Sequence, residues 1–157
     1  MVKKSLWLIL LTLFAFIGLL GLAARETVLP VSQESLAASR VYAYRSWQSV
    51  GVRVREGDEL RIRARGSWMY TPGEYHGPEG HARYMSPAFY PLPSVPGGAL
   101  IGRIGENGEP FYVGRAGVWW MRESGLLYLR IDDDILSDND GFVTVEVTVV
   151  SPSPTPN

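Results

Sequence analysis

The sequence predicts an all-β protein whose folded part is an antiparallel β-sandwich. Several short runs alternate apolar and polar residues with a period of two, as in strands that are buried on one face. The 157 residues include 17 glycines and 11 prolines, a content that favours many turns over long helices. No amphipathic helix pattern occurs after residue 40. Short antiparallel strands joined by turns in one domain-sized unit indicate a sandwich.

Residues 1–24 are expected to form a signal peptide or a signal-anchor helix. Lys3 and Lys4 precede an apolar run, 6–24, whose only polar residue is Thr12. This charge order is that of an export signal, and a cut after Ala23 would follow small residues. The run also approaches the roughly 20 residues needed to span a bilayer, so cleavage and retention both stay open. In either case we expect the rest of the chain to be exported, either secreted or held at the outer face of the cytoplasmic membrane.

The folded domain lies between two polar segments. Residues 25–40 mix small, polar and charged side chains and are expected to form a linker or stalk. Residues 151–157 alternate proline with small polar residues, a composition typical of an unfolded tail. Residues 41–150 remain, which is enough for one core without disulfides. The chain has no cysteine, and this excludes thiolate metal sites and cysteine nucleophiles.

Seven strands are expected within the domain. They are residues 41–45, 50–55, 60–65, 98–104, 110–114, 127–131 and 143–149. In 50–55, for example, the valines share one face and the arginines share the other. Asn107 and Gly108 suit a tight hairpin between the fourth and fifth strands.

Two polar connections separate these strands, and the charge balance limits what they can bind. Residues 70–96 are rich in proline and aromatic residues, and loops of this length inside compact domains are usually functional. Residues 132–140 form an acidic loop. Beyond residue 30 the chain has 12 arginines against 15 acidic residues, so it lacks the clustered cationic charge that nucleic-acid binding requires.

The acidic loop is the strongest candidate for a metal site. Its five aspartates in nine residues repel one another unless water or a cation screens them. Calcium takes about six to eight hard oxygen ligands, which carboxylates, asparagine amides and backbone carbonyls provide. The spacing is not that of an EF-hand, because the loop has no alternating triple-aspartate start and no glutamate at the twelfth position. A solvated acidic turn is the alternative interpretation.

Both histidines lie in one short segment. His76 and His81, with Glu74 and Glu79, offer the donor types of a zinc site. Two glycines and a proline separate the histidines, however, and no helix would hold them on one face. Hydrogen bonding to a sugar, or exposure in a loop, is therefore favoured over zinc.

Tryptophan rings are candidates for stacking on sugar rings, although burial in the core is the favoured interpretation for each. They include Trp47 and Trp68, and the adjacent Trp119 and Trp120, of which strand alternation sends one ring inward and one outward. The chain has no Gly-x-Ser-x-Gly nucleophile elbow, and spacing alone assigns no carboxylate pair to glycoside cleavage. We expect no enzymatic activity.

Seven short motifs follow one another in a characteristic order over residues 41–150. They are Gly-Val-Arg-Val-Arg-Glu-Gly-Asp at 51–58, Ala-Arg-Gly-Ser-Trp-Met-Tyr at 64–70, Gly-Pro-Glu-Gly at 77–80, Gly-Ala-Leu-Ile-Gly-Arg-Ile-Gly at 98–105, Leu-Tyr-Leu at 127–129, Asp-Asp at 132–133 and Asp-Asn-Asp-Gly at 138–141. In this order they resemble the PA-I galactophilic lectins, a family of bacterial calcium-dependent lectins with a galactose-binding-like β-sandwich. Each motif is common alone, and the ordered set carries the resemblance.

The resemblance implies a calcium site. Its ligands are the backbone carbonyl of Tyr70 and the side chains of Asp133, Asp138 and Asn139. The loop before Asp138 is shorter than the family's, so the family's threonine ligand has no direct match, and Ser137 or Asp134 is expected to replace it.

The resemblance also implies a saccharide ligand, since two hydroxyls of a hexose complete the calcium coordination in the family. The family's sugar-contacting histidine aligns near Tyr84, and His81 is close but out of register. The residues expected to bind sugar are Tyr84, His81, His76, Asp133 and Asn139.

We therefore expect noncatalytic, calcium-dependent binding of a saccharide, such as a galactose-like sugar, at the cell envelope, with the membrane contacted only through the N-terminal segment. The alternative is a structural or protein-interaction domain whose acidic loop holds a stabilising calcium or no ligand.

Overall fold

The computed structural model describes residues 34–152, and all regular structure in that range is β-strand. The expected signal or anchor segment 1–24 lies outside the described residues, as do the last five residues of the tail. In the described part of the chain, no helix has the length and apolar character needed to cross a membrane.

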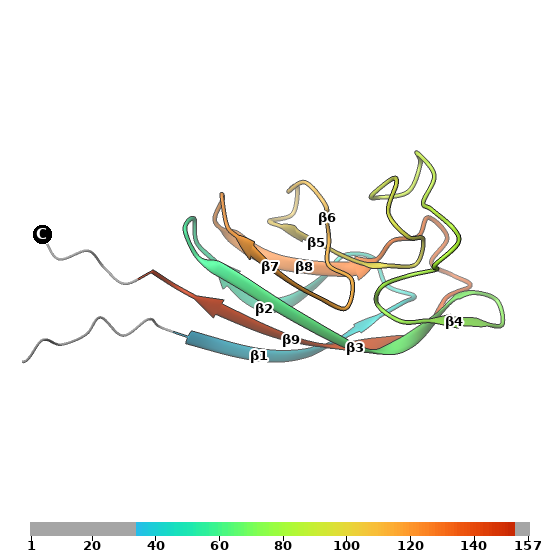
Figure 1. Ribbon diagram of the computed structural model, residues 1–157, viewed down its shortest axis with the longest axis horizontal. Helices are drawn as coiled ribbons and strands as arrows, with labels where there is room; N and C mark the ends of the chain where they lie inside the picture. Colours follow the sequence, from blue (N-terminus) through green and yellow to red (C-terminus); the bar gives the residue numbers. More distant parts are fainter. Residues whose placement is uncertain (1–33, 153–157) are drawn as a thin grey trace, which may run out of the picture. The chain divides into compact units, whose positions relative to one another are not determined.

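Two antiparallel sheets form a sandwich, as predicted (Figure 1). The strands are β1 (Glu34–Tyr42), β2 (Gln48–Val54), β3 (Glu59–Thr71), β4 (Glu74–His76), β5 (Leu100–Ile104), β6 (Phe111–Tyr112), β7 (Ala116–Trp120), β8 (Gly125–Ile131) and β9 (Asp140–Val150). The five-stranded sheet has the order β1-β9-β3-β4, with β7 also paired to β3. The four-stranded sheet has the order β2-β8-β5-β6.

The core between the sheets follows the predicted alternation. The valines of β2 and β9 and the aliphatic residues of β3 and β8 are buried, whereas the arginines of β2 and β3 are exposed. Trp68 is fully buried, and its Nε1 donates to the carbonyl of Gly98 at 2.8 Å, so it is a core residue. Trp119 packs on the core against Phe111 while Trp120 is exposed, which confirms the inward and outward pair.

Three features differ from the expectations. β1 begins at Glu34, inside the segment expected to be a linker, because its small side chains pair along nine positions with β9. β4 and β7 were not predicted; each pairs only with β3, along a few residues. Residues 105–110 form a longer connection than a tight hairpin, and a Cβ at Gly108 would lie 1.9 Å from the carbonyl oxygen of Ile104.

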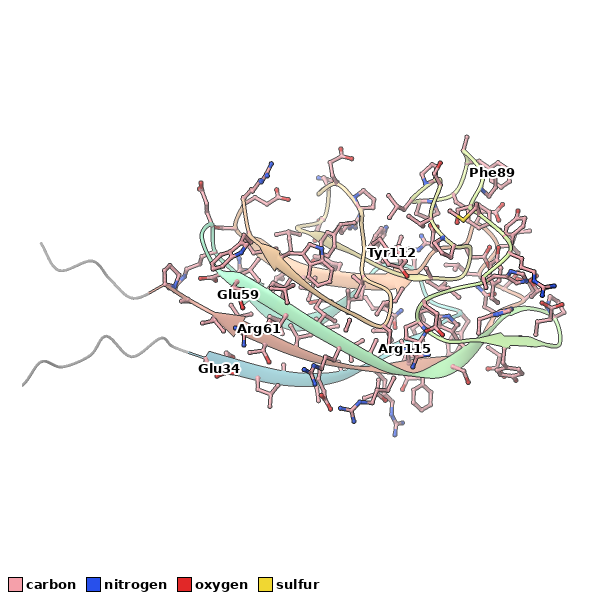
Figure 2. The ribbon with its side chains drawn as sticks, in the orientation of Figure 1. Glu34, Glu59, Arg61, Phe89, Tyr112 and Arg115 are labelled. Carbon is pink, nitrogen blue, oxygen red and sulfur yellow. The ribbon has the colours of Figure 1, made fainter. Side chains whose placement is uncertain are left out.

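The two ends of the sandwich carry different features (Figure 1). β1 begins and β9 ends at one end, where Glu34 pairs with Val150. The connection 77–99 and the acidic loop 132–140 lie at the opposite end, close to β4. Figure 2 shows Glu34 at the first end and Phe89 at the second. Both candidate binding loops are therefore remote from the termini of the described chain.

Candidate functional site

Asp132 directly follows β8, and its side chain points into the interior of the protein. Its side chain is fully buried, and its carboxylate accepts hydrogen bonds from the Ser86 hydroxyl at 2.5 Å and the Leu92 amide at 3.0 Å. Its backbone carbonyl accepts from the Gly98 amide at 2.8 Å. Burial raises the pKa of Asp132, and the hydrogen bonds from Ser86 and Leu92 oppose that rise. Asp132 therefore anchors the connection 77–99 to the end of β8.

Asp133 and Asn139 are held together at the base of the acidic loop. Both are buried, and Nδ2 of Asn139 donates to Oδ2 of Asp133 at 2.8 Å. Burial raises the pKa of Asp133, and hydrogen bonds from Asn139 and Tyr90 oppose that rise. The other amide atom, Oδ1 of Asn139, is buried without a hydrogen-bond partner. An unpaired buried acceptor costs about 1–3 kcal/mol, which a bound cation would recover.

Tyr70 lies at the irregular end of β3. The register between β3 and β4 shifts between Met69 and Thr71, and the pairing of β3 with β9 ends at Met69, so Tyr70 has no partner in either ladder. A residue at such a bulge is left out of the backbone hydrogen-bond pattern. The ring of Tyr70 packs over Gly98, which has φ +73° and where a Cβ would lie 2.5 Å from the ring.

These elements surround a cleft of about 410 Å³. The residues that line it include Tyr70, His81, Arg83, Tyr84, Tyr90, Asp133, Asp134 and Asp138. Aspartates of the acidic loop and aromatic residues of the connection 77–99 therefore line the same cavity. The rings of Tyr70 and Tyr84 have centroids 6.4 Å apart.

The structure brings most of the predicted site residues together. Tyr70, Asp133 and Asp138, proposed as calcium ligands, and His81 and Tyr84, proposed for sugar, all line the cleft. Three others are not among the cleft-lining residues: Asn139, which is buried behind Asp133, Ser137, which is exposed in the loop, and His76, which lies on β4.

Sequence reasoning missed two positioning residues. Tyr90 shares a hydrogen bond with Tyr70 at 3.1 Å between their hydroxyls, and it also bonds Asp133. Arg130, expected on the outer face of its strand, is buried and donates to the backbone carbonyls of Ile131 and Asp133. The aromatic content of residues 70–96 pointed to Tyr90 as one of several rings. Nothing in the alternating pattern of β8 distinguishes Arg130 from an exposed arginine.

The cleft offers donor types that calcium takes, although Asp133, Asp134 and Asp138 do not form a group whose carboxylate oxygens all lie within 4.8 Å of one another. Asp133, Asp134 and Asp138 supply carboxylates, and Tyr70 supplies a carbonyl outside the ladders. Asn139 does not line the cleft, but it carries an unpaired amide oxygen next to Asp133. These are hard oxygen ligands of the kind that calcium takes, and they come from the acidic loop and from the end of β3.

The fold and the cleft together define an antiparallel two-sheet β-sandwich with a polar cleft at one end. Neither a family model nor a curated protein matches the chain. Among solved structures, the chain is similar to the N-terminal domain of EclA, described as a PllA-like lectin, with a TM-score of 0.57 and 24% identity. The similarity covers 72% of this chain and 95% of that domain. It confirms, for the fold, the resemblance to PA-I-type lectins.

Proposed function

We propose that this protein is a noncatalytic, calcium-dependent saccharide-binding module. The observation that carries the proposal is the cleft in which Tyr70, Asp133 and Asp138 face the rings of Tyr84 and His81. Acidic oxygens beside exposed aromatic rings suit a polyhydroxylated ligand with an apolar ring face better than they suit an anion or a hydrocarbon. The description of the similar EclA domain as a lectin agrees with this proposal.

The side chains of the cleft would have different roles in metal binding and in sugar binding. When bound, calcium supplies a charged centre that can exchange its water ligands for sugar hydroxyls. Asp133 is held in place for that task by Asn139 and Tyr90, so little ordering of the loop is needed on binding. Tyr84, which is 44% exposed, offers a ring face for stacking on the sugar.

A glycan array probed with full-length protein, with calcium and with chelator, tests the proposal. Calcium-dependent binding to a defined group of saccharides is expected. A protein that binds calcium but no glycan would instead be the structural or protein-interaction domain, and the saccharide proposal would be wrong.

Variants of cleft residues separate metal ligation from stacking. Asp133→Ala is expected to abolish binding of both calcium and the best array saccharide, because it removes a buried charged ligand. Asn139→Ala is expected to weaken both, since it removes a neutral oxygen. Tyr84→Ala is expected to leave calcium binding unchanged and to weaken saccharide binding by about 1 kcal/mol, the value of roughly 40 Å² of apolar surface at about 25 cal/mol per Å². Isothermal titration measures each. Wild-type saccharide affinity of Asp133→Ala in chelator would contradict the calcium role.

Export remains part of the proposal, with the domain secreted or held at the outer face of the cytoplasmic membrane. It depends on the hydrophobic segment 6–24. The intact mass of protein isolated from the native envelope decides between the two forms. A mature N-terminus near Ala24 indicates a cleaved signal, and the full-length mass indicates a retained anchor.

A further inference from the structure

A second cluster of metal-ligating side chains lies beside the cleft, where β4 and the following turn meet. Glu74 and His76 are two residues apart on β4, so they project from the same face of the strand. The chain then reverses through a turn in which the Gly80 amide donates to the Gly77 carbonyl at 3.0 Å. This reversal brings His81 onto His76, with ring centroids 4.6 Å apart.

The donor atoms of the three side chains converge. Oε2 of Glu74 lies 3.5 Å from Nε2 of His76 and 3.7 Å from Nε2 of His81. One donor atom from each residue lies within 4.8 Å of the other two. Two ligands of a tetrahedral zinc ion, each about 2.0–2.1 Å from the metal, are separated by about 3.4 Å. The cluster is therefore close to the spacing of a zinc site, and small side-chain rotations complete it.

One donor atom of the cluster is buried without a hydrogen-bond partner. Nε2 of His76 is buried and has no hydrogen-bond partner, since the glutamate oxygen 3.5 Å away does not meet hydrogen-bond geometry. Buried polar atoms in folded proteins are nearly always paired. A metal ion between His76, His81 and Glu74 would satisfy this nitrogen with the ligand type that zinc prefers.

We propose that Glu74, His76 and His81 form a zinc site at the rim of the cleft, distinct from the oxygen-rich calcium site of the acidic loop. Two imidazoles and one carboxylate favour zinc over calcium, because calcium selects hard oxygen ligands. Three protein ligands leave the fourth position of a tetrahedral ion open. Since His81 also lines the cleft, that position lies where water or a ligand group can reach it.

Zinc binding requires one exchange of hydrogen bonds. The amide of Arg83 donates to Nδ1 of His81 at 3.1 Å, which places the proton of neutral His81 on Nε2. Ligation through Nε2 moves that proton to Nδ1 and transfers the Arg83 amide to water. Arg83 is exposed, so the exchange replaces one exposed hydrogen bond by another and opposes binding only weakly.

Tag-free, full-length protein in detergent, depleted of metal and then saturated with calcium, tests the site by titration with zinc alone. Saturating calcium fills the acidic loop first, so its carboxylates do not compete for the zinc. One zinc per chain is expected. Cobalt in place of zinc is expected to give the visible absorption of a tetrahedral nitrogen and oxygen site, which reports ligation directly.

Variants assign the ligands. His76→Gln, His81→Gln and Glu74→Gln are each expected to lower zinc affinity by about tenfold or more, since even changes next to a ligand cost about 10–100-fold. Glu79→Gln is the matched control, because it removes a carboxylate of the same turn that pairs with Arg115 at 2.7 Å and is not part of the converging Glu74, His76 and His81 group. Glu79→Gln is expected to keep wild-type affinity. Absence of zinc binding by the wild type, or unchanged binding by a His76→Gln/His81→Gln double variant that retains its melting temperature, would overturn the proposal.

Discussion

Asp132 and Asp133, the two residues that follow β8, have different structural roles. Asp132 is turned inward and bonds the hydroxyl of Ser86 and the amide of Leu92, so it holds the connection 77–99 in place. Asp133 lines the cleft and is itself positioned by Asn139. The shape of the cleft therefore depends on a buried carboxylate that is not expected to touch either metal or sugar.

Ser86→Ala tests the anchoring role of Asp132. The substitution removes one of two hydrogen bonds to a buried carboxylate, and the expected loss of unfolding free energy is about 1.5–3 kcal/mol, the value for bonds to charged groups. Chemical denaturation measures it. Ser67→Ala, the same change at an exposed position of β3, is the control and is expected to stay within about 0.5 kcal/mol of wild type. Equal effects of the two substitutions would contradict the anchoring role.

At the scale of the elements, the long alternating strands could be predicted from the sequence, and the short strands β4 and β7 could not. Alternation in residues 50–55, 60–65, 127–131 and 143–149 predicts strands because each buries one face, and all four are present. β4 is three residues long, and β7 is five residues long and includes Gly117. Neither therefore shows an alternation of apolar and polar residues that is long enough to indicate a strand.

The candidate site could likewise be predicted from the sequence only in part. The acidic loop and the aromatic connection are visible as composition, and Tyr70, Asp133 and Asp138 were placed by motif order. Two glycines and a proline between His76 and His81, with no helix to hold them on one face, predicted that they stay apart, but a short strand and a glycine turn bring them together. That convergence depends on pairing with β3, which no local pattern encodes.

The acidic loop as an element is expected to make stability depend on pH. Burial raises the pKa of Asp132 and Asp133, so the folded state binds their protons more tightly than the unfolded chain. The free energy of unfolding then falls as pH rises. Metal-free protein is expected to lose stability from about pH 3.9, the ordinary aspartate value, up through the raised pKa values of the folded state. Thermal melts in chelator across this range measure the loss.

Calcium and one variant serve as controls for this pH effect. Saturating calcium favours the ionised carboxylates and is expected to reduce or reverse the loss. Asp133→Asn keeps the shape of the side chain without its charge, and it is expected to show a shallower dependence in chelator than wild type. Identical slopes for wild type and Asp133→Asn would show that the loop does not titrate in this way.

At the scale of the whole domain, the ends of the described chain lie at one end of the sandwich and the cleft lies at the other. Glu34 and Val150 are paired at the end of the sheet from which both termini of the described chain leave, and the cleft lies at the other end. A domain attached to a surface through either terminus would thus present the cleft away from its attachment point. This arrangement agrees with the proposed export and saccharide binding.

Site-specific labelling tests this separation, because the chain has no native cysteine. Phe89 is 70% exposed and neighbours the cleft residue Tyr90, whereas Leu36 is 72% exposed near the start of β1. A polyethylene glycol chain coupled to Phe89→Cys is expected to weaken binding of the best array saccharide by about tenfold or more, equal to about 1.4 kcal/mol. The same polymer on Leu36→Cys is expected to leave that affinity unchanged, since it extends from the far end of the sandwich. Melting temperatures with and without the label confirm that both proteins stay folded. Equal losses at the two positions would show that the polymer acts through the fold rather than by blocking the cleft, and no loss at position 89 would place saccharide binding elsewhere on the surface.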